Sequence, residues 1–150
     1  MSYTMMIRPI TRATRFCKSY SYPGGEPTST LVNLTGDAGY TSARTIHSGF
    51  NYFDHLEPYG LKSQVWDRWT TARIADKWVD KAISQNLWLI EVFHAMNLPS
   101  YPYGCSESSL KEHLSYIRSR RREIDNLTVW ATIEQIRRKL TRELPFQATT

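Results

Sequence analysis

The chain has 150 residues, with 19 Lys and Arg against 14 Asp and Glu, and a formal net charge of +5 at pH 7. This length fits one domain, and an apolar content of 41% is enough for a packed core and excludes a disordered tail. No uncharged apolar run reaches the roughly 18–20 residues of a membrane span, and two cysteines are too few for a disulfide scaffold.

The first 60 residues contain six of the seven glycines and four of the seven prolines. Because both residue types interrupt helices, we expect a loop-rich, extended N-terminal arm with at most two short strands, at residues 30–35 and 48–53. The first 22 residues carry four basic side chains and no acid. This composition is also typical of a mitochondrial transit peptide, which remains a minor alternative. A secretory signal is not expected because the segment has no apolar region, so an intracellular or virion location is favoured.

From residue 61 onward, the spacing of apolar side chains predicts helices. A stripe at intervals of three and four residues predicts a helix over residues 61–83, with Trp69 in the core. Residues 87–96 contain one formal charge in ten, which predicts a buried core helix that includes Phe93 and ends before the following prolines.

Ser106 is a favourable N-cap residue, and the apolar positions after it predict a third helix up to residue 124. A bend at Asp125 and Asn126 then precedes a fourth helix over residues 129–144. The predicted fold class is therefore mainly α, a small four-helix-type bundle over about residues 61–145. The arm region of residues 1–60 is expected to pack on the helical unit of residues 61–150 or on a neighbouring subunit.

The sequence contains no strong signature of a metal site, a phosphate-binding loop or a catalytic family. His47, Asp54 and His55 remain an alternative as an assembled metal site, but surface histidines are the favoured interpretation. Cys105 with His94 or His113 is the one pairing that could support a nucleophilic thiolate. We therefore expect a non-enzymatic protein without a cofactor.

The high arginine content is the feature that indicates a function, since the chain has thirteen arginines and six lysines. The planar guanidinium group suits bidentate contacts with phosphate. On a helical wheel, Arg118, Arg121 and Arg122 lie on one side and Arg120 faces away. The candidate nucleic-acid-binding residues are Arg8, Arg12, Arg15, Lys18, Arg118, Arg121, Arg122, Arg138 and Arg142.

Residues 106–120 resemble the recognition helix of sigma-region-4 and LuxR-type helix-turn-helix modules, which implies insertion of this helix into DNA. The resemblance covers about fifteen residues. Where those families have a supporting helix and a tight turn, this chain has Pro99, Pro102 and Gly104, so membership of either family is not inferred.

The sequence thus predicts a nucleic-acid-binding structural or assembly subunit that contacts the phosphates of DNA or RNA and self-associates. An arm followed by a small bundle is similar in outline to the coat proteins of filamentous and rod-shaped viruses. A helix-turn-helix-like transcription regulator and a small protein-interaction or inhibitor module remain the alternatives. If the arginines are only solvated, the nucleic-acid prediction fails.

Overall fold

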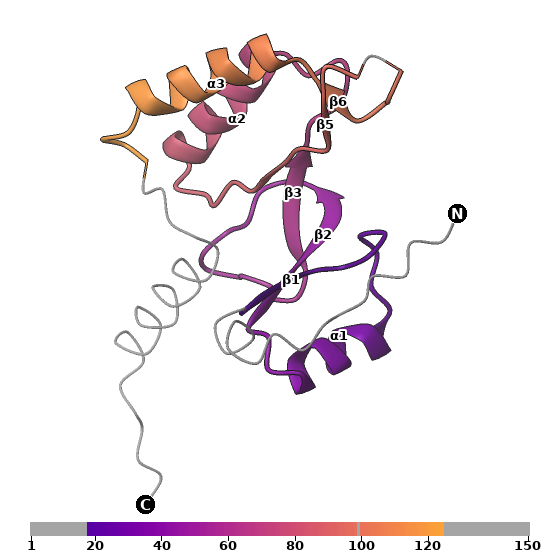
Figure 1. Ribbon diagram of the computed structural model, residues 1–150. Helices are drawn as coiled ribbons and strands as arrows, with labels where there is room; N and C mark the ends of the chain where they lie inside the picture. Colours follow the sequence, from indigo (N-terminus) through magenta and orange to yellow (C-terminus); the bar gives the residue numbers. More distant parts are fainter. Residues whose placement is uncertain (1–17, 99, 125–150) are drawn as a thin grey trace, which may run out of the picture.

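The computed structural model describes residues 18–98 and 100–124 and has an α/β architecture (Figure 1). Four parallel strands form one curled sheet in the order β1-β2-β3-β4, and two more strands form a separate parallel pair. The strands are β1 (Ser19–Ser21), β2 (Ser42–Ser48), β3 (Leu61–Val65), β4 (Glu91–Val92), β5 (Ala95–Met96) and β6 (Gly104–Cys105). The helices are α1 (Ser29–Asp37), α2 (Ala72–Ser84) and α3 (Glu107–Ser119).

The prediction of a mainly α four-helix bundle is therefore wrong. Residues 61–65, expected to begin the first helix, form β3, and residues 87–96, expected to form a core helix, contain β4 and β5. Short apolar runs are compatible with a buried strand as well as with a buried helix. In β3 the alternation of buried and exposed side chains is typical of a strand, since Leu61 and Ser63 are buried while Lys62 between them is exposed.

Both strands predicted in the N-terminal part are also wrong. Residues 30–35 lie within α1, which begins after Thr28, whose side-chain oxygen accepts a hydrogen bond from the amide of Leu31 at 3.2 Å. The second predicted strand, at residues 48–53, begins where β2 ends. The predicted boundary at residue 60 runs between β2 and β3, which pair directly in the sheet.

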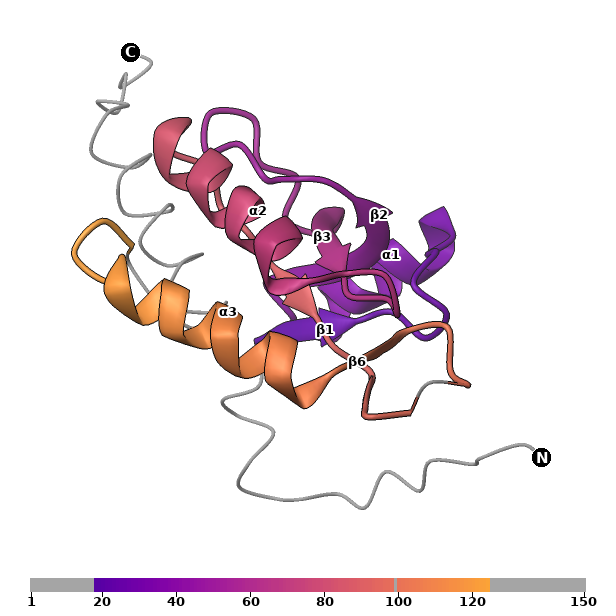
Figure 2. The same cartoon turned by 90° about the horizontal axis from the view of Figure 1, so that it is seen from above.

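Helices α2 and α3 pack side by side, as both views show, whereas α1 lies near β1 and β2 (Figures 1 and 2). The buried stripe of α2, formed by Ala72, Ala75 and Val79, agrees with the predicted periodicity. The predicted N-cap at Ser106 is confirmed, because its hydroxyl oxygen accepts a hydrogen bond from the amide of Ser109 at 3.1 Å. The bend and helix predicted after residue 124 lie outside the described residues.

The main hydrophobic core lies between the sheet and these two helices and is centred on Trp66, which is fully buried. The indole of Trp78 contacts Trp66 edge-on, with ring centroids 6.3 Å apart. The predicted core positions of Trp69 and Phe93 are wrong, since 76% and 37% of their surfaces are exposed. None of the described helices is long and apolar enough to cross a membrane.

Candidate functional site

Two polar residues, 27 positions apart in the sequence, follow the carboxyl ends of β3 and β4. In the register of these strands, Gln64 pairs with Glu91 and Val65 pairs with Val92. Just beyond the strands, the rings of Trp66 and Phe93 lie 5.1 Å apart. Asp67 and His94 are the next residues of the two segments.

Asp67 and His94 leave the sheet at the carboxyl ends of β3 and β4. Trp66, the residue before Asp67, packs against Trp78 of α2 and His113 of α3. This edge is where open parallel α/β sheets generally bind ligands.

Two connected loops form the surroundings of this pair. The amide of Arg68 donates a hydrogen bond to the carbonyl of Pro102 at 2.9 Å, which joins the loop after β3 to the loop between β5 and β6. The imidazole of His94, which lies between β4 and β5, contacts the rings of Tyr101 and Tyr103 in the second loop, at centroid distances of 6.2 and 5.5 Å. His94 and both tyrosines are exposed to solvent.

The carboxylate of Asp67 holds the first loop in place. One of its oxygens accepts hydrogen bonds from the amide of Trp69 at 2.9 Å and from the hydroxyl of Thr70 at 2.8 Å. The other carboxylate oxygen makes neither bond. The same turn presents the indole of Trp69 to solvent, with 76% of its surface exposed. An exposed tryptophan on a rigid turn is a contact surface for a flat apolar ring.

A cluster of three ionisable side chains is buried between α2, α3 and β4. The imidazole of His113 has no exposed surface, and its Nδ1 and Nε2 lie 2.7 Å and 3.1 Å from carboxylate oxygens of Asp76 and Glu91. Burial alone lowers the pKa of His113, but the hydrogen bonds and charges of Glu91 and Asp76 outweigh it and raise the pKa above its usual value. Because Glu91 also accepts a hydrogen bond from Trp66 at 3.0 Å, the cluster stabilises the core.

The thiol site that the sequence left open as an alternative is not assembled. Cys105 is buried, and burial raises the pKa of its thiol, which disfavours the reactive thiolate. Both nitrogens of His113 are engaged with carboxylates, and His94 contacts tyrosines rather than Cys105 in the ring contacts of the described chain.

The alternative metal site is likewise not formed within the described ranges, where no group of three or more His, Cys, Asp or Glu side chains is suitable for a metal ion. The imidazole of His55 binds the neighbouring carboxylate of Asp54 at 2.6 Å and stacks on Tyr52, with centroids 4.9 Å apart. Both members of that ion pair are largely exposed.

The predicted arginine cluster is partly described. Arg118, Arg121 and Arg122 are exposed at the end of α3, and no carboxylate of the described residues lies within 4.0 Å of their guanidinium groups. Arg120 differs, since it binds Asp80 at 3.1 Å and Glu123 at 2.7 Å. The helical wheel does not apply to Arg121 and Arg122, because α3 ends at Ser119.

Lys18 is half-buried just before β1, where its carbonyl accepts a hydrogen bond from the amide of Thr41 at 2.8 Å. It is therefore far along the chain from the arginine cluster and belongs to another part of the fold. The other candidate nucleic-acid-binding residues lie outside the described residues; they are Arg8, Arg12, Arg15, Arg138 and Arg142.

Comparison of the chain with protein families, with curated proteins and with solved structures finds no match. The residues before α3 form β6 and the loop before it, and not the supporting helix of a helix-turn-helix module. Sequence reasoning missed Asp67 and named His94 only as a partner for Cys105. A prediction of parallel strands would have placed both at one edge of a sheet.

Proposed function

We propose that the chain binds a neutral, sugar-like ligand at the carboxyl edge of β3 and β4. The observation that carries this proposal is the exposure of Trp69, Tyr101 and Tyr103 on two loops that the Arg68–Pro102 hydrogen bond joins, with the imidazole of His94 against both tyrosine rings. Sites of this kind combine apolar rings with a few polar groups that orient the ligand.

The chemistry of the two loops favours a ligand without net charge. Residues 66–71 and 93–104 contain one acidic and one basic side chain, Asp67 and Arg68. Trp69, Tyr101 and Tyr103 offer flat apolar faces, which suit the apolar face of a pyranose ring, while the carboxylate and the imidazole suit its hydroxyl groups. A polyanion would gain little from loops whose formal charges cancel.

His94 is suited to move a proton, because an imidazole is the commonest general acid or base in proteins. The proposal therefore includes proton transfer by His94, at a hydroxyl group or a water molecule on the bound ligand. The carboxylate of Asp67 supports this site by holding the loop after β3.

Binding is tested by titration with soluble neutral tetrasaccharides of glucose, mannose and N-acetylglucosamine, followed by tryptophan fluorescence and by calorimetry. Trp69→Ala is expected to weaken binding about tenfold, which corresponds to about 1.4 kcal/mol of ring contact. Tyr52→Ala is the matched control, since Tyr52 is an exposed aromatic residue of another loop. Equal affinity of wild type and Trp69→Ala for every tetrasaccharide, or binding to none, would refute the binding proposal.

Proton transfer is tested by hydrolysis of aryl glycosides and acetylated oligosaccharides. We expect His94→Gln to abolish turnover and Asp67→Asn to reduce it, while Tyr52→Ala retains it. If wild type releases neither product, the acid–base part of the proposal is wrong.

A second candidate function, contact with nucleic-acid phosphates, is favoured by the exposure of Arg118, Arg121 and Arg122 without a carboxylate partner among the described residues. We propose it as a separate surface of the chain. Changing the three residues together to Glu is expected to abolish binding to DNA and RNA fragments at about 50 mM salt, where phosphate contacts are strongest. Changing Lys77 and Lys81 of α2 to Glu is the matched control. Unchanged affinity of the triple variant would contradict this proposal.

A further inference from the structure

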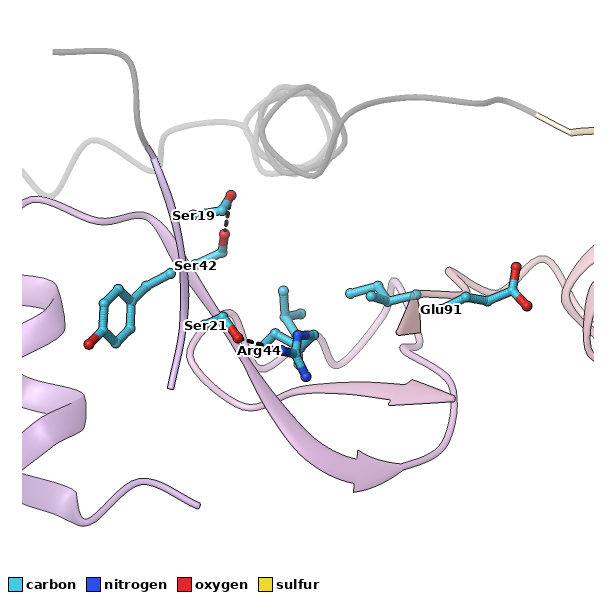
Figure 3. Close-up of a pocket in the computed structure, with 8 residues that line it drawn as sticks. Ser19, Ser21, Ser42, Arg44 and Glu91 are labelled. Atoms are coloured by element: carbon cyan, nitrogen blue, oxygen red, sulfur yellow. Dashed lines mark hydrogen bonds between the residues drawn. The ribbon is translucent and has the colours of Figure 1, made fainter. Parts of the chain in front are cut away.

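A cavity of about 250 Å³ opens among β1, β2, β3 and the segment leading into β4 (Figure 3). In its wall, Leu61 precedes Asp67 by six residues and Glu91 precedes His94 by three. The residues that matter for its chemistry are Ser21, Ser42, Arg44, Leu61, Ile90 and Glu91.

Arg44 supplies the charge of this cavity. It comes from β2, which lies inside the sheet between β1 and β3, and its side chain is half-buried. Its guanidinium donates hydrogen bonds to the carbonyl of Thr45 at 3.0 Å and to the hydroxyl oxygen of Ser21, and both acceptors are neutral. No carboxylate within the described ranges lies within 4.0 Å of it. Burial lowers the pKa of Arg44, which is the sign of a charge that loses water without gaining a counter-ion.

Glu91 is the one acidic residue in the cavity wall, and its carboxylate is engaged elsewhere. Its two oxygens bind the indole Nε1 of Trp66 at 3.0 Å and the Nε2 of His113 at 3.1 Å. Figure 3 shows this carboxylate pointing away from Arg44. The charge of Arg44 is therefore not neutralised by the cavity wall.

We propose that this cavity binds a phosphate-type oxyanion, as free phosphate or as a phosphate monoester. A guanidinium has five N–H groups, and two of them serve Thr45 and Ser21, so three remain for a ligand. The hydroxyl of Ser21 accepts from Arg44 and keeps its own proton to donate to the same anion. The volume lies below the 300–1,000 Å³ of most ligand pockets, which fits a single small group.

The test compares the thermal unfolding of the full chain in sodium phosphate and in sodium chloride of equal ionic strength. For wild type, the melting temperature is expected to rise by about 3–5 °C for each tenfold increase in phosphate above Kd. Arg44→Met is expected to lose this rise, whereas Arg73→Met, the loss of an exposed arginine of α2, is expected to keep it. Because phosphate also stabilises proteins by exclusion from their surfaces, only the difference between the variants is diagnostic.

A second measurement excludes a purely structural role of Arg44. In chloride, Arg44→Met is expected to melt at or above the temperature of wild type, because methionine removes an uncompensated buried charge at similar side-chain length. A marked fall would show that the hydrogen bonds of Arg44 to Thr45 and Ser21 stabilise the fold by more than its desolvated charge costs, and would overturn the proposal. An equal phosphate effect in wild type and Arg44→Met, or an equal effect of acetate, would also overturn it. Glucose 6-phosphate in place of phosphate decides between the free anion and the monoester.

Discussion

Replacing His113 by leucine removes the cation from a buried cluster of three ionisable groups. In the folded chain the imidazole is completely buried, while the side chains of Asp76 and Glu91 are 21% and 13% exposed. Breaking a buried ion pair by removing one partner costs about 3–5 kcal/mol, because the remaining charge has no counter-ion. Since water reaches both carboxylates, we expect a loss of about 3 kcal/mol. For a chain of this length that loss lowers the melting temperature by about 6–12 °C.

The stability difference between wild type and His113→Leu is expected to depend on pH. Since the folded state raises the pKa of His113 above the unfolded value of about 6.5, its contribution to the free energy of unfolding is complete below about pH 6.5. The contribution declines as the pH rises through the folded pKa. Wild type is therefore expected to exceed His113→Leu in stability by the largest amount at pH 6, and the difference is expected to narrow toward pH 9.

Urea unfolding at pH 6, 7, 8 and 9 measures this difference directly. Tyr116→Phe is the matched control on the same helix, since it removes a hydrogen bond to the exposed Asp80. The control is expected to cost less than about 1 kcal/mol, with no change in that cost between pH 6 and pH 8. A difference between wild type and His113→Leu that is constant from pH 6 to pH 9 would refute the ionic interpretation. So would a variant as stable as wild type at pH 6.

Three further predictions follow from burial and backbone geometry. Trp66→Ala is expected to cost about 3–5 kcal/mol in urea unfolding, whereas Trp69→Ala is expected to change stability by less than about 0.5 kcal/mol; similar losses would contradict the assigned core. Gly25→Ala is expected to lower the melting temperature, because Gly25 has a φ of +79° and an added Cβ would lie 2.0 Å from a neighbouring side-chain carbon; an unchanged melting temperature would contradict this. In a Cys17→Ser background, iodoacetamide is expected to label Cys105 only after unfolding, because burial disfavours its thiolate; rapid labelling of the native chain would contradict this.

The sequence predicted those elements whose signals are local. Ser106 caps α3 as expected because a serine at this position satisfies an amide of the first turn. The stripe of α2 also followed from spacing alone. By contrast, β3 and β4 are short, and their pairing joins residues more than 25 positions apart. The spacing of apolar residues within one segment contains no information on which distant segment it pairs with. It therefore predicts helices where β3 and β4 form.

The candidate sites could not be predicted for the same reason. His94 lies near Cys105 in the sequence, whereas in the fold its imidazole contacts the rings of Tyr101 and Tyr103. Arg44 was one basic residue in a segment of net negative charge, and only the fold shows that it lines a cavity without an acidic partner from the described residues.

The buried cluster of His113 and the cavity of Arg44 meet at Glu91. The carboxylate of Glu91 binds Trp66 and His113 in the cluster, while Leu61, Ile90 and Glu91 line the cavity. Since His113 contacts none of the groups that would hold the anion, His113→Leu is expected to lower the melting temperature and leave the phosphate-dependent rise unchanged. A parallel loss of both would show that the cluster and the cavity are coupled through Glu91.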